Sequence, residues 1–298
     1  MTYHVGEIAV QAYVGVQTEA SRIGNILTPN ISAPAQKFLD LQRMLVASTI
    51  DTQGRVWASL LVGEPGFIHV VDENTLEIDA TPHPEYPLGA SLAPGALIGM
   101  ISIDPANVKR VRINGRVVEQ AERLLVRTEQ VYFNCPKYIQ RREFTTHSVE
   151  SEQSPPVFHT GKLFAHQQQW IRKADTFFIA SVNPESGADA SHRGGYPGFV
   201  HIIGENLLLF PDYKGNMMFQ TLGNLAVDPR AGLLFIDFEQ GQTLQLTGKA
   251  SILWDEKLIA SLPGAQRLVL FEIASTLESS AGNTIHGRFI EYSPYNPT

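Results

Sequence analysis

The feature that most constrains the fold of this chain is an internal repeat. Four short motifs occur twice, in the same order, once in each half of the 298 residues. Repetition in a fixed order is the signature of a repeated structural unit. We therefore predict two related halves, most simply explained by a duplication. The motif pairs are Tyr3–Gly6 with Phe158–Gly161, Pro65–His69 with Pro197–His201, Arg112–Arg116 with Gln245–Lys249, and Arg123–Val126 with Arg267–Leu270.

Two irregular segments define the limits of the halves. Residues 148–156 are polar and end in two prolines, as a linker does. The segment Thr18–Pro34 is rich in Ser, Thr, Asn, Gly and Pro, which predicts a loop inserted into the first half. The expected organisation is a first domain at 1–147, a linker at 148–156 and a second domain at 157–298.

Composition indicates a globular, cytoplasmic protein. Hydrophobic residues make up 43% of the chain and charged residues 18%, so each half can bury a core. The net charge of −7 argues against general binding to nucleic acid or anionic membrane. No segment approaches the roughly 20 apolar residues of a membrane span. The single cysteine, Cys135, excludes an intrachain disulfide and favours a reducing compartment.

The hydrophobic pattern predicts short strands preceded by one helix in each half. Gln36–Met44 and Lys162–Lys173 place apolar residues at helical spacing. Short runs bounded by Gly and Pro follow them, which indicates a small barrel or sandwich in each half. The strands expected in the second half are Phe177–Val182, Gly198–Ile203, Leu207–Phe210, Gly232–Phe238 and Thr243–Ile252.

The richest candidate for a ligand site is the segment Gly187–Gly195. On a strand, Ser191 and Arg193 share one face and His192 points to the other. The glycines that follow allow a ligand to approach the backbone, and a guanidinium suits a phosphate or the edge of a flavin ring. A polar hairpin with an exposed arginine is the alternative. The repeat aligns Ser191–Arg193 with Ala58–Leu60 of the first half, so that apolar Leu60 stands in the place of Arg193. Folding alone does not explain why this strand is polar in the second half and apolar in the first.

A second candidate is the segment Phe210–Asn216. Asn216 is a good N-cap for a helix expected at Met217–Leu225, whose first amides could face an anion. Lys214 could add positive charge. An ordinary strand, turn and helix with a solvated lysine is the alternative.

Several other kinds of site are excluded by the sequence. Ser191 and His192 point to opposite faces of a strand and no nucleophile elbow is present, so a serine hydrolase is not expected. The histidines show no metal-ligand spacing, and there is no phosphate-binding glycine loop. His69 and His201 lie in matching strands, and we interpret both as structural.

These motifs resemble one known family. Ser191–Gly195, Pro197–Val200, Phe210–Asn216, Leu222–Leu225 with Asp228–Arg230, and Asn134–Ile139 resemble the FMN-binding split-barrel proteins related to pyridoxamine 5′-phosphate oxidase. The resemblance implies a mainly β fold with short helices, built as two tandem split β-barrels that form a pseudo-dimer. It also implies that FMN lies between two barrels and that the chain forms a homodimer.

The resemblance assigns the candidate site. Ser191 and Arg193 would contact the phosphate or the ring edge, and the second barrel would hold most contacts while the first acts as a scaffold and site wall. The implied cofactor-binding residues are Ser191, His192, Arg193, Gly194, Asp212, Tyr213, Lys214, Asn216, Asn224 and Gln245 from the second half, with Asn134 and Lys137 from the first.

The expected function is an FMN-dependent oxidoreductase acting on a small redox substrate, with NAD(P)H as a possible electron donor. The alternatives are a flavin- or haem-binding protein without turnover, and a structural protein in which both sites are lost. The oxidase's Arg-x-x-Leu-Lys strand, Ser-Arg-Lys turn and C-terminal Arg/His signature are missing here. The resemblance therefore does not imply vitamin B6 synthesis.

Overall fold

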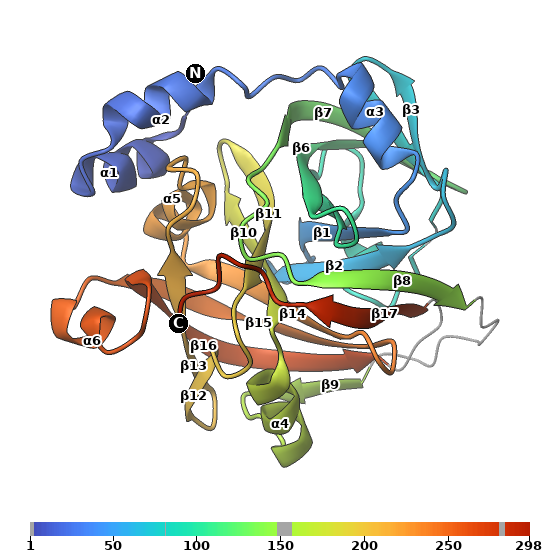
Figure 1. The fold of residues 1–298 in the computed structure, drawn as a ribbon. Helices are drawn as coiled ribbons and strands as arrows, with labels where there is room; N and C mark the ends of the chain where they lie inside the picture. The colour runs from blue at the N-terminus through green and yellow to red at the C-terminus, as the bar shows by residue number, and fades with distance from the viewer. Residues whose placement is uncertain (1–2, 81, 148–156, 280–283) are drawn as a thin grey trace.

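Two curled antiparallel sheets dominate the computed structural model, which describes residues 3–80, 82–147, 157–279 and 284–298 (Figure 1). The first sheet contains β1 (Met44–Ile50), β2 (Val56–Val62), β3 (Ile68–Asp72), β4 (Thr75–Ile78), β5 (Leu97–Asp104), β6 (Lys109–Gln120) and β7 (Leu124–Phe133). The second contains β10 (Thr176–Asn183), β11 (Gly187–Gly194), β12 (His201–Gly204), β13 (Leu207–Tyr213), β14 (Arg230–Asp237), β15 (Gln242–Leu253) and β16 (Ala265–Ser279), with β9 (Val157–Thr160) paired to β16. The predicted mainly β fold of two tandem split barrels is confirmed.

The two sheets have the same strand order. The first runs β2-β1-β5-β6-β7-β4-β3 and the second β11-β10-β14-β15-β16-β13-β12. Gly115 in β6 and Gly248 in β15 lie at equivalent bulges, where an added Cβ would be 2.1 Å from the Arg127 carbonyl oxygen and 2.0 Å from that of Glu272. The third motif pair therefore repeats a structural requirement for glycine. An origin by duplication stays a prediction.

The sequence alignment of β2 with β11 is wrong by one residue. Gly99 and Gly232 occupy equivalent places in β5 and β14. Across the neighbouring strand, Gly99 aligns through Ser48 with Ala58 of β2, and Gly232 aligns through Ala180 with Ala190 of β11. A slip of one residue exchanges the two faces of a strand. Leu61, not Leu60, therefore occupies the place of Arg193. The equivalent residues are Ala58 and Ala190, Ser59 and Ser191, Leu60 and His192, and Leu61 and Arg193.

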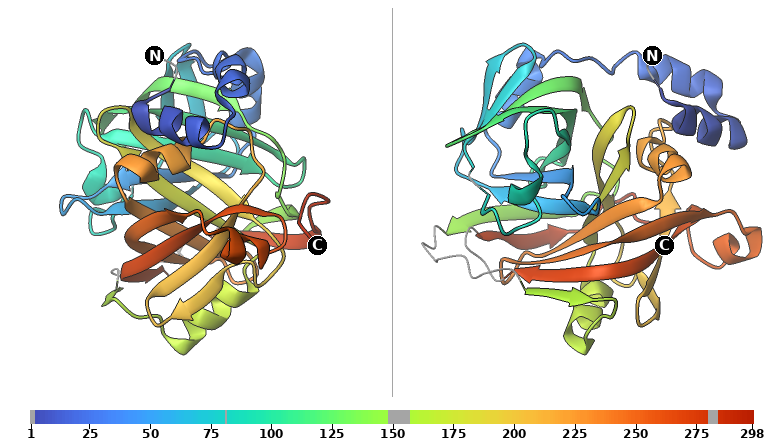
Figure 2. Two further views of the ribbon diagram at one scale, coloured as in Figure 1. Left: turned by 90° about the vertical axis from the view of Figure 1, so that its left-hand side faces the viewer. Right: turned by 180° about the vertical axis from the view of Figure 1, so that it is seen from behind.

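The N-terminal segment packs on the second barrel. It forms α1 (Val5–Tyr13) and α2 (Gln17–Gly24), and α1 lies beside α5 (Gln220–Val227) in Figures 1 and 2. The α1 and α5 backbones meet at Gly6 and Gly223, where a Cβ on Gly6 would be 2.1 Å from the Gly223 carbonyl oxygen. The motif at Tyr3–Gly6 thus has no structural likeness to Phe158–Gly161, which belongs to β9.

Three local predictions need correction. The predicted loop Thr18–Pro34 contains α2, because Ala20 packs in a small buried cluster with Tyr3. The predicted helix Gln36–Met44 is α3 (Ala33–Leu39), and Met44 already begins β1. The helix after β13 begins at Gln220 with Phe219, in the left-handed region, as its N-cap, so Asn216 is not the cap.

The remaining elements connect the halves. The predicted helix Lys162–Lys173 appears as α4 (Ala165–Lys173), and two short helices are η1 (Gly89–Ser91) and α6 (Glu256–Ala260). The end of the first half, β8 (Arg141–His147), pairs with β17 (Thr284–Glu291) at the end of the second. The linker predicted at 148–156 lies outside the described residues. No helix in the described part of the chain is long and apolar enough to span a membrane.

The edge strands β2 and β11 pack the two barrels together. Each lies against the other barrel's sheet at a glycine. A Cβ on Gly99 would be 2.4 Å from the Asp189 amide nitrogen, and one on Gly232 would be 2.7 Å from the Val56 carbonyl oxygen. An apolar cluster from both halves, including Met44, Val46, Phe178 and Leu234, fills the interface around these contacts.

The substitution Gly232→Ala is expected to lower the thermal unfolding temperature by several degrees. The new Cβ would meet three backbone atoms of β2 within 2.8 Å, and overpacking of this kind costs about 1–3 kcal/mol. Calorimetry measures the effect. The control is Gly204→Ala on an exposed strand end, where the nearest atom is 3.4 Å away. Equal melting temperatures for both variants would contradict the close packing of the barrels.

Candidate functional site

A basic pocket lies where the two barrels meet. The second barrel contributes β11, the end of β13 and the following loop with the start of α5, and the first contributes β6 and the loop after β7. The cavity volume is about 90 Å³, the space of a few water molecules or one phosphate group. It is lined by Arg110, Arg112, Asn134, Cys135, Lys137, Tyr138, Ser191–Gly194, Phe199, Pro211–Tyr213, Gly215–Met217, Phe219, Thr221 and Leu222.

Positive charge dominates this basic pocket. Four cations line it, Arg110, Arg112, Lys137 and Arg193, against one carboxylate, Asp212. Arg193 forms an ion pair with Asp212, whose other oxygen lies 3.0 Å from Nε of Arg267. Arg112, only 4% exposed, pairs with the buried Asp189. The pocket thus has more cationic groups than carboxylates to pair with them.

Arg110 is a buried cation that has no counterion among the described residues. It is 8% exposed, and no carboxylate pairs with it among the described residues. Burial lowers the pKa of Arg110 to about 10, and the neighbouring Arg112 and Arg193 add to the effect. Its Nε makes no hydrogen bond within the described chain. Because an uncompensated buried charge is costly, an anion that enters the pocket would stabilise this arginine.

His192 is a neutral hydrogen-bond donor beside Arg110. Its Nδ1 lies 2.9 Å from Nη1 of Arg110. A guanidinium can only donate, so Nδ1 accepts and the ring proton is on Nε2. Burial, followed by the charges of Arg110, Arg142 and Arg193, holds the pKa of His192 well below its usual value of 6.5. Nε2 has no partner among the residues described here, so its proton is available to a ligand.

Most residues predicted from the sequence line this pocket. Asn216 donates from Nδ2 to Oδ1 of Asn134 at 2.9 Å, which ties the loop of one barrel to that of the other. His192 lines the pocket together with Ser191 and Arg193, although the strand pattern placed it on the opposite face. The predicted residues found in the lining are Asn134, Lys137, Ser191, His192, Arg193, Gly194, Asp212, Tyr213 and Asn216.

Three predicted residues lie outside the basic pocket. Lys214 is exposed, and its carbonyl oxygen accepts a hydrogen bond from the Tyr138 hydroxyl. Asn224 faces the N-terminal helix, where its Oδ1 is 2.9 Å from Nε2 of His4. Gln245 is buried between the barrels and accepts a hydrogen bond from Ser59 at 3.0 Å.

Sequence reasoning missed the two arginines of β6. Arg110, Arg112 and Asn114 alternate with apolar residues, a pattern typical of a strand with one solvated face. The docking of the second barrel covers that face. The repeat could have indicated Arg112 as a site residue. It pairs Arg112 with Gln245, and the resemblance had already assigned Gln245 to the flavin.

Four described positions that are equivalent to residues of the basic pocket carry neutral side chains in the other half. Thr243 and Gln245 replace Arg110 and Arg112, while Leu60 and Leu61 replace His192 and Arg193. The hydrogen bond from Ser59 to Gln245 closes part of this region. These four described positions therefore form no cationic cluster, whereas the first barrel supplies two arginines to the site of the second.

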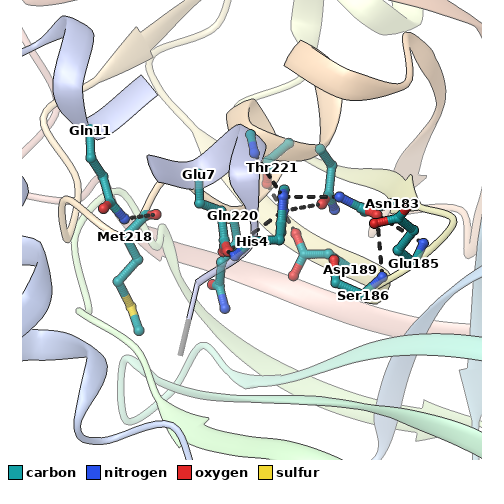
Figure 3. Close-up of polar contacts among 12 residues, drawn as sticks. His4, Glu7, Gln11, Asn183, Glu185, Ser186, Asp189, Met218, Gln220 and Thr221 are labelled. Atoms are coloured by element: carbon teal, nitrogen blue, oxygen red, sulfur yellow. Dashed lines mark hydrogen bonds and ion pairs between the residues drawn. The ribbon is translucent and has the colours of Figure 1, made fainter. Parts of the chain in front are cut away.

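A polar cavity of about 450 Å³ lies next to the basic pocket, under α1 (Figure 3). Its lining includes Glu7 from α1, Asn114 from the first sheet and Asp189 from β11. Asp189 accepts a hydrogen bond from Thr221, which lines the basic pocket, at 3.1 Å. Burial raises the pKa of Glu7 to about 7, although a hydrogen bond from the His4 amide and the charge of Arg112 lower it.

The arrangement defines a tandem split-barrel protein with one basic pocket between its barrels. Residues 163–280 match the family model described as pyridoxamine 5′-phosphate oxidase. The match covers most of the second half and confirms the resemblance to this family. No curated protein matches the chain.

Several solved structures are similar to parts of the chain. One is a protein described as a putative pyridoxamine 5′-phosphate oxidase from Lactobacillus delbrueckii, at 16% identity over 39% of this chain and 93% of that one, with a TM-score of 0.32. Another is HupZ from Group A Streptococcus, at 9% identity over 41% and 98%, with a TM-score of 0.34. A third is an FMN-binding protein from Syntrophomonas wolfei, at 11% identity over 37% and 86%, with a TM-score of 0.28.

Proposed function

We propose that this chain is a flavoprotein that binds one FMN, with the phosphate of the cofactor in the basic pocket. The observation that carries the proposal is the buried Arg110, which has no carboxylate partner in the described chain and lies beside the unpaired Nε2–H of His192. Both donors suit a phosphate oxygen. The match of the second barrel to the oxidase family supports a flavin as the bearer of that phosphate.

The residues present fit a flavin phosphate. A cavity of about 90 Å³ admits the phosphate but not the ring system, which would extend through the mouth of the pocket. Arg110 and Lys137 would hold the phosphate, since Arg112 and Arg193 already pair with carboxylates. Tyr138 and Tyr213, whose ring centroids are 5.2 Å apart, offer aromatic surface in the same lining.

Reaction class and assembly follow as parts of the proposal. A bound flavin supplies hydride and electron transfer, and the protein supplies position and electrostatics. Arg110 and His192 would orient the cofactor by donating hydrogen bonds, and the burial of both would keep water away from the phosphate. We propose a cytoplasmic oxidoreductase with a small redox substrate, acting as a homodimer. NAD(P)H is the electron donor to test first.

FMN is expected to bind the purified protein at one molecule per chain, and at least tenfold more tightly than riboflavin, which lacks the phosphate. The charge-assisted hydrogen bonds to the phosphate account for the difference. Quenching of flavin fluorescence measures both affinities, and a parallel titration with hemin tests haem as the ligand. Equal affinity for FMN and riboflavin would contradict a phosphate in the basic pocket. A Soret shift with hemin and no flavin binding would favour the haem alternative.

A further inference from the structure

A large cavity on the second barrel has no part in the proposed flavin site. It has a volume of about 570 Å³, within the range of small-molecule sites, and shares no lining residue with the basic pocket. It lies between α4, the hairpin from β14 to β15 and the ribbon of β8 and β17. Since β8 ends the first half and β17 the second, the cavity is assembled only in the tandem chain.

Aromatic side chains form much of its wall. Trp170 of α4 and Phe238 of the hairpin line the cavity together with Phe289 and Tyr292 near the C-terminus. Phe289 is 42% exposed and Tyr292 is 38% exposed, so both still have surface to offer. Neighbouring aromatic faces of this kind favour a flat ring, which packs by stacking or edge contacts.

The polar groups of the cavity are nearly balanced in charge. Arg142 donates to both carboxylate oxygens of Asp175, at 2.7 and 2.6 Å, and its guanidinium lies 4.8 Å from the ring centroid of Phe238. Lys173 on one side faces two carboxylates, Asp237 and Glu239, so the lining holds two cations and three carboxylates. The lining therefore disfavours an anion, in contrast to the basic pocket.

One buried hydroxyl in the lining has no partner. Thr176 is 7% exposed, and its Oγ1 makes no hydrogen bond within the described chain. An unsatisfied buried polar group costs about 1–3 kcal/mol, so such groups usually have a protein, water or ligand partner. A ligand with a hydrogen-bonding atom on its ring edge would satisfy this hydroxyl.

We propose that this cavity is a binding site for a neutral, planar, aromatic small molecule that packs on Trp170, Phe238 and Phe289 and hydrogen-bonds to Thr176. Both strands of the ribbon that joins the halves line the cavity, β8 through Arg142 and β17 through Phe289. Ligand binding is therefore expected to stabilise the pairing of β8 with β17. This site is separate from the flavin proposal, because it shares no lining residue with the basic pocket.

Indole serves as the probe because it is neutral and planar and carries one N–H donor. Saturation-transfer NMR on the full chain is expected to show binding, with an affinity about fivefold lower in Thr176→Val and more than tenfold lower in Phe289→Ala. Thr276→Val is a matched control, since Thr276 is also buried with an unpartnered hydroxyl but does not line the cavity. Phe133→Ala controls for loss of an exposed phenylalanine in the first barrel.

The results separate this proposal from the flavin site. Saturating FMN is expected to leave indole binding unchanged. No saturation transfer at millimolar indole, equal losses in test and control variants, or displacement of indole by FMN would each overturn the proposal. Failure of FMN to bind would leave it intact.

Discussion

Replacing Arg110 with methionine is expected to weaken FMN binding about 30-fold while leaving the protein as stable as before, or more stable. A hydrogen bond from a buried guanidinium to a phosphate contributes about 2 kcal/mol. Arg110 has no carboxylate partner among the described residues, so its removal leaves no carboxylate unpaired, and the loss falls on the hydrogen bond to Nδ1 of His192, which the relieved desolvation offsets. Replacing a buried cation with an apolar side chain of similar length removes a desolvation cost. Fluorescence titration and thermal unfolding of the same samples measure both effects.

The control for this variant is Arg116→Met on the same strand. Arg116 is exposed and pairs with Glu129 at 2.9 Å, outside the basic pocket. It is expected to bind FMN as the unmodified protein does. Unchanged affinity in the Arg110 variant would refute the assignment of the phosphate site. Loss of folding in that variant would show instead that Arg110 has a structural role.

Replacing Glu7 with glutamine is expected to stabilise the protein by roughly 3 kcal/mol at pH 8 and to have no effect at pH 4. Burial raises the pKa of Glu7 from 4.5 to about 7, so the folded state favours the protonated carboxyl. The contribution of the protonated Glu7 carboxyl to the free energy of unfolding is fully present below pH 4.5 and is lost as the pH rises to about 7 and beyond. Denaturant unfolding across pH 4–8.5 measures the difference.

Other groups around Glu7 shape the same pH profile. Tyr3 and His4 precede it on the N-terminal segment, Arg112 faces it from β6, and α5 packs on it through Gly223. Burial lowers the pKa of His4, whose contribution is therefore lost as the pH falls below 6.5, opposite in sign to that of Glu7. Glu19→Gln on the exposed face of α2 is the control. A pH profile unchanged by Glu7→Gln would contradict burial of this carboxyl.

Both expected results depend on contacts between segments that are distant in the sequence. Arg110 is separated from His192 by 82 positions, and His4 from Asn224 by 220. The strand pattern of β6 predicts which of its residues share a face, but it is the same for a solvated face and a covered one. This is why Arg110 and Arg112 look like surface residues in the sequence, and why Gln245 and Asn224 look available to a ligand.

Local patterns were informative where a residue's role depends on its own strand or turn. Gly115 and Gly248 repeat because a bulge excludes a Cβ in both barrels, and the strands of the second half lie close to their predicted positions. The segment around Arg193 was recognised as polar without a folding reason and Phe210–Asn216 as a second candidate for a ligand site, and both line the basic pocket. The repeat placed Leu60, instead of Leu61, opposite Arg193 because flanking motifs do not define strand register.

The sequence by itself therefore determined the β character, the tandem organisation and part of the lining of the candidate site. Only the tertiary structure decided that the first barrel supplies Arg110 and Arg112 and that the N-terminal helices pack on the second barrel. The physical reason is that side-chain alternation is a property of one strand, whereas burial and the resulting need for a counterion depend on which surface packs against it. One docking event between the barrels converts an apparently solvated strand face into the wall of a basic pocket.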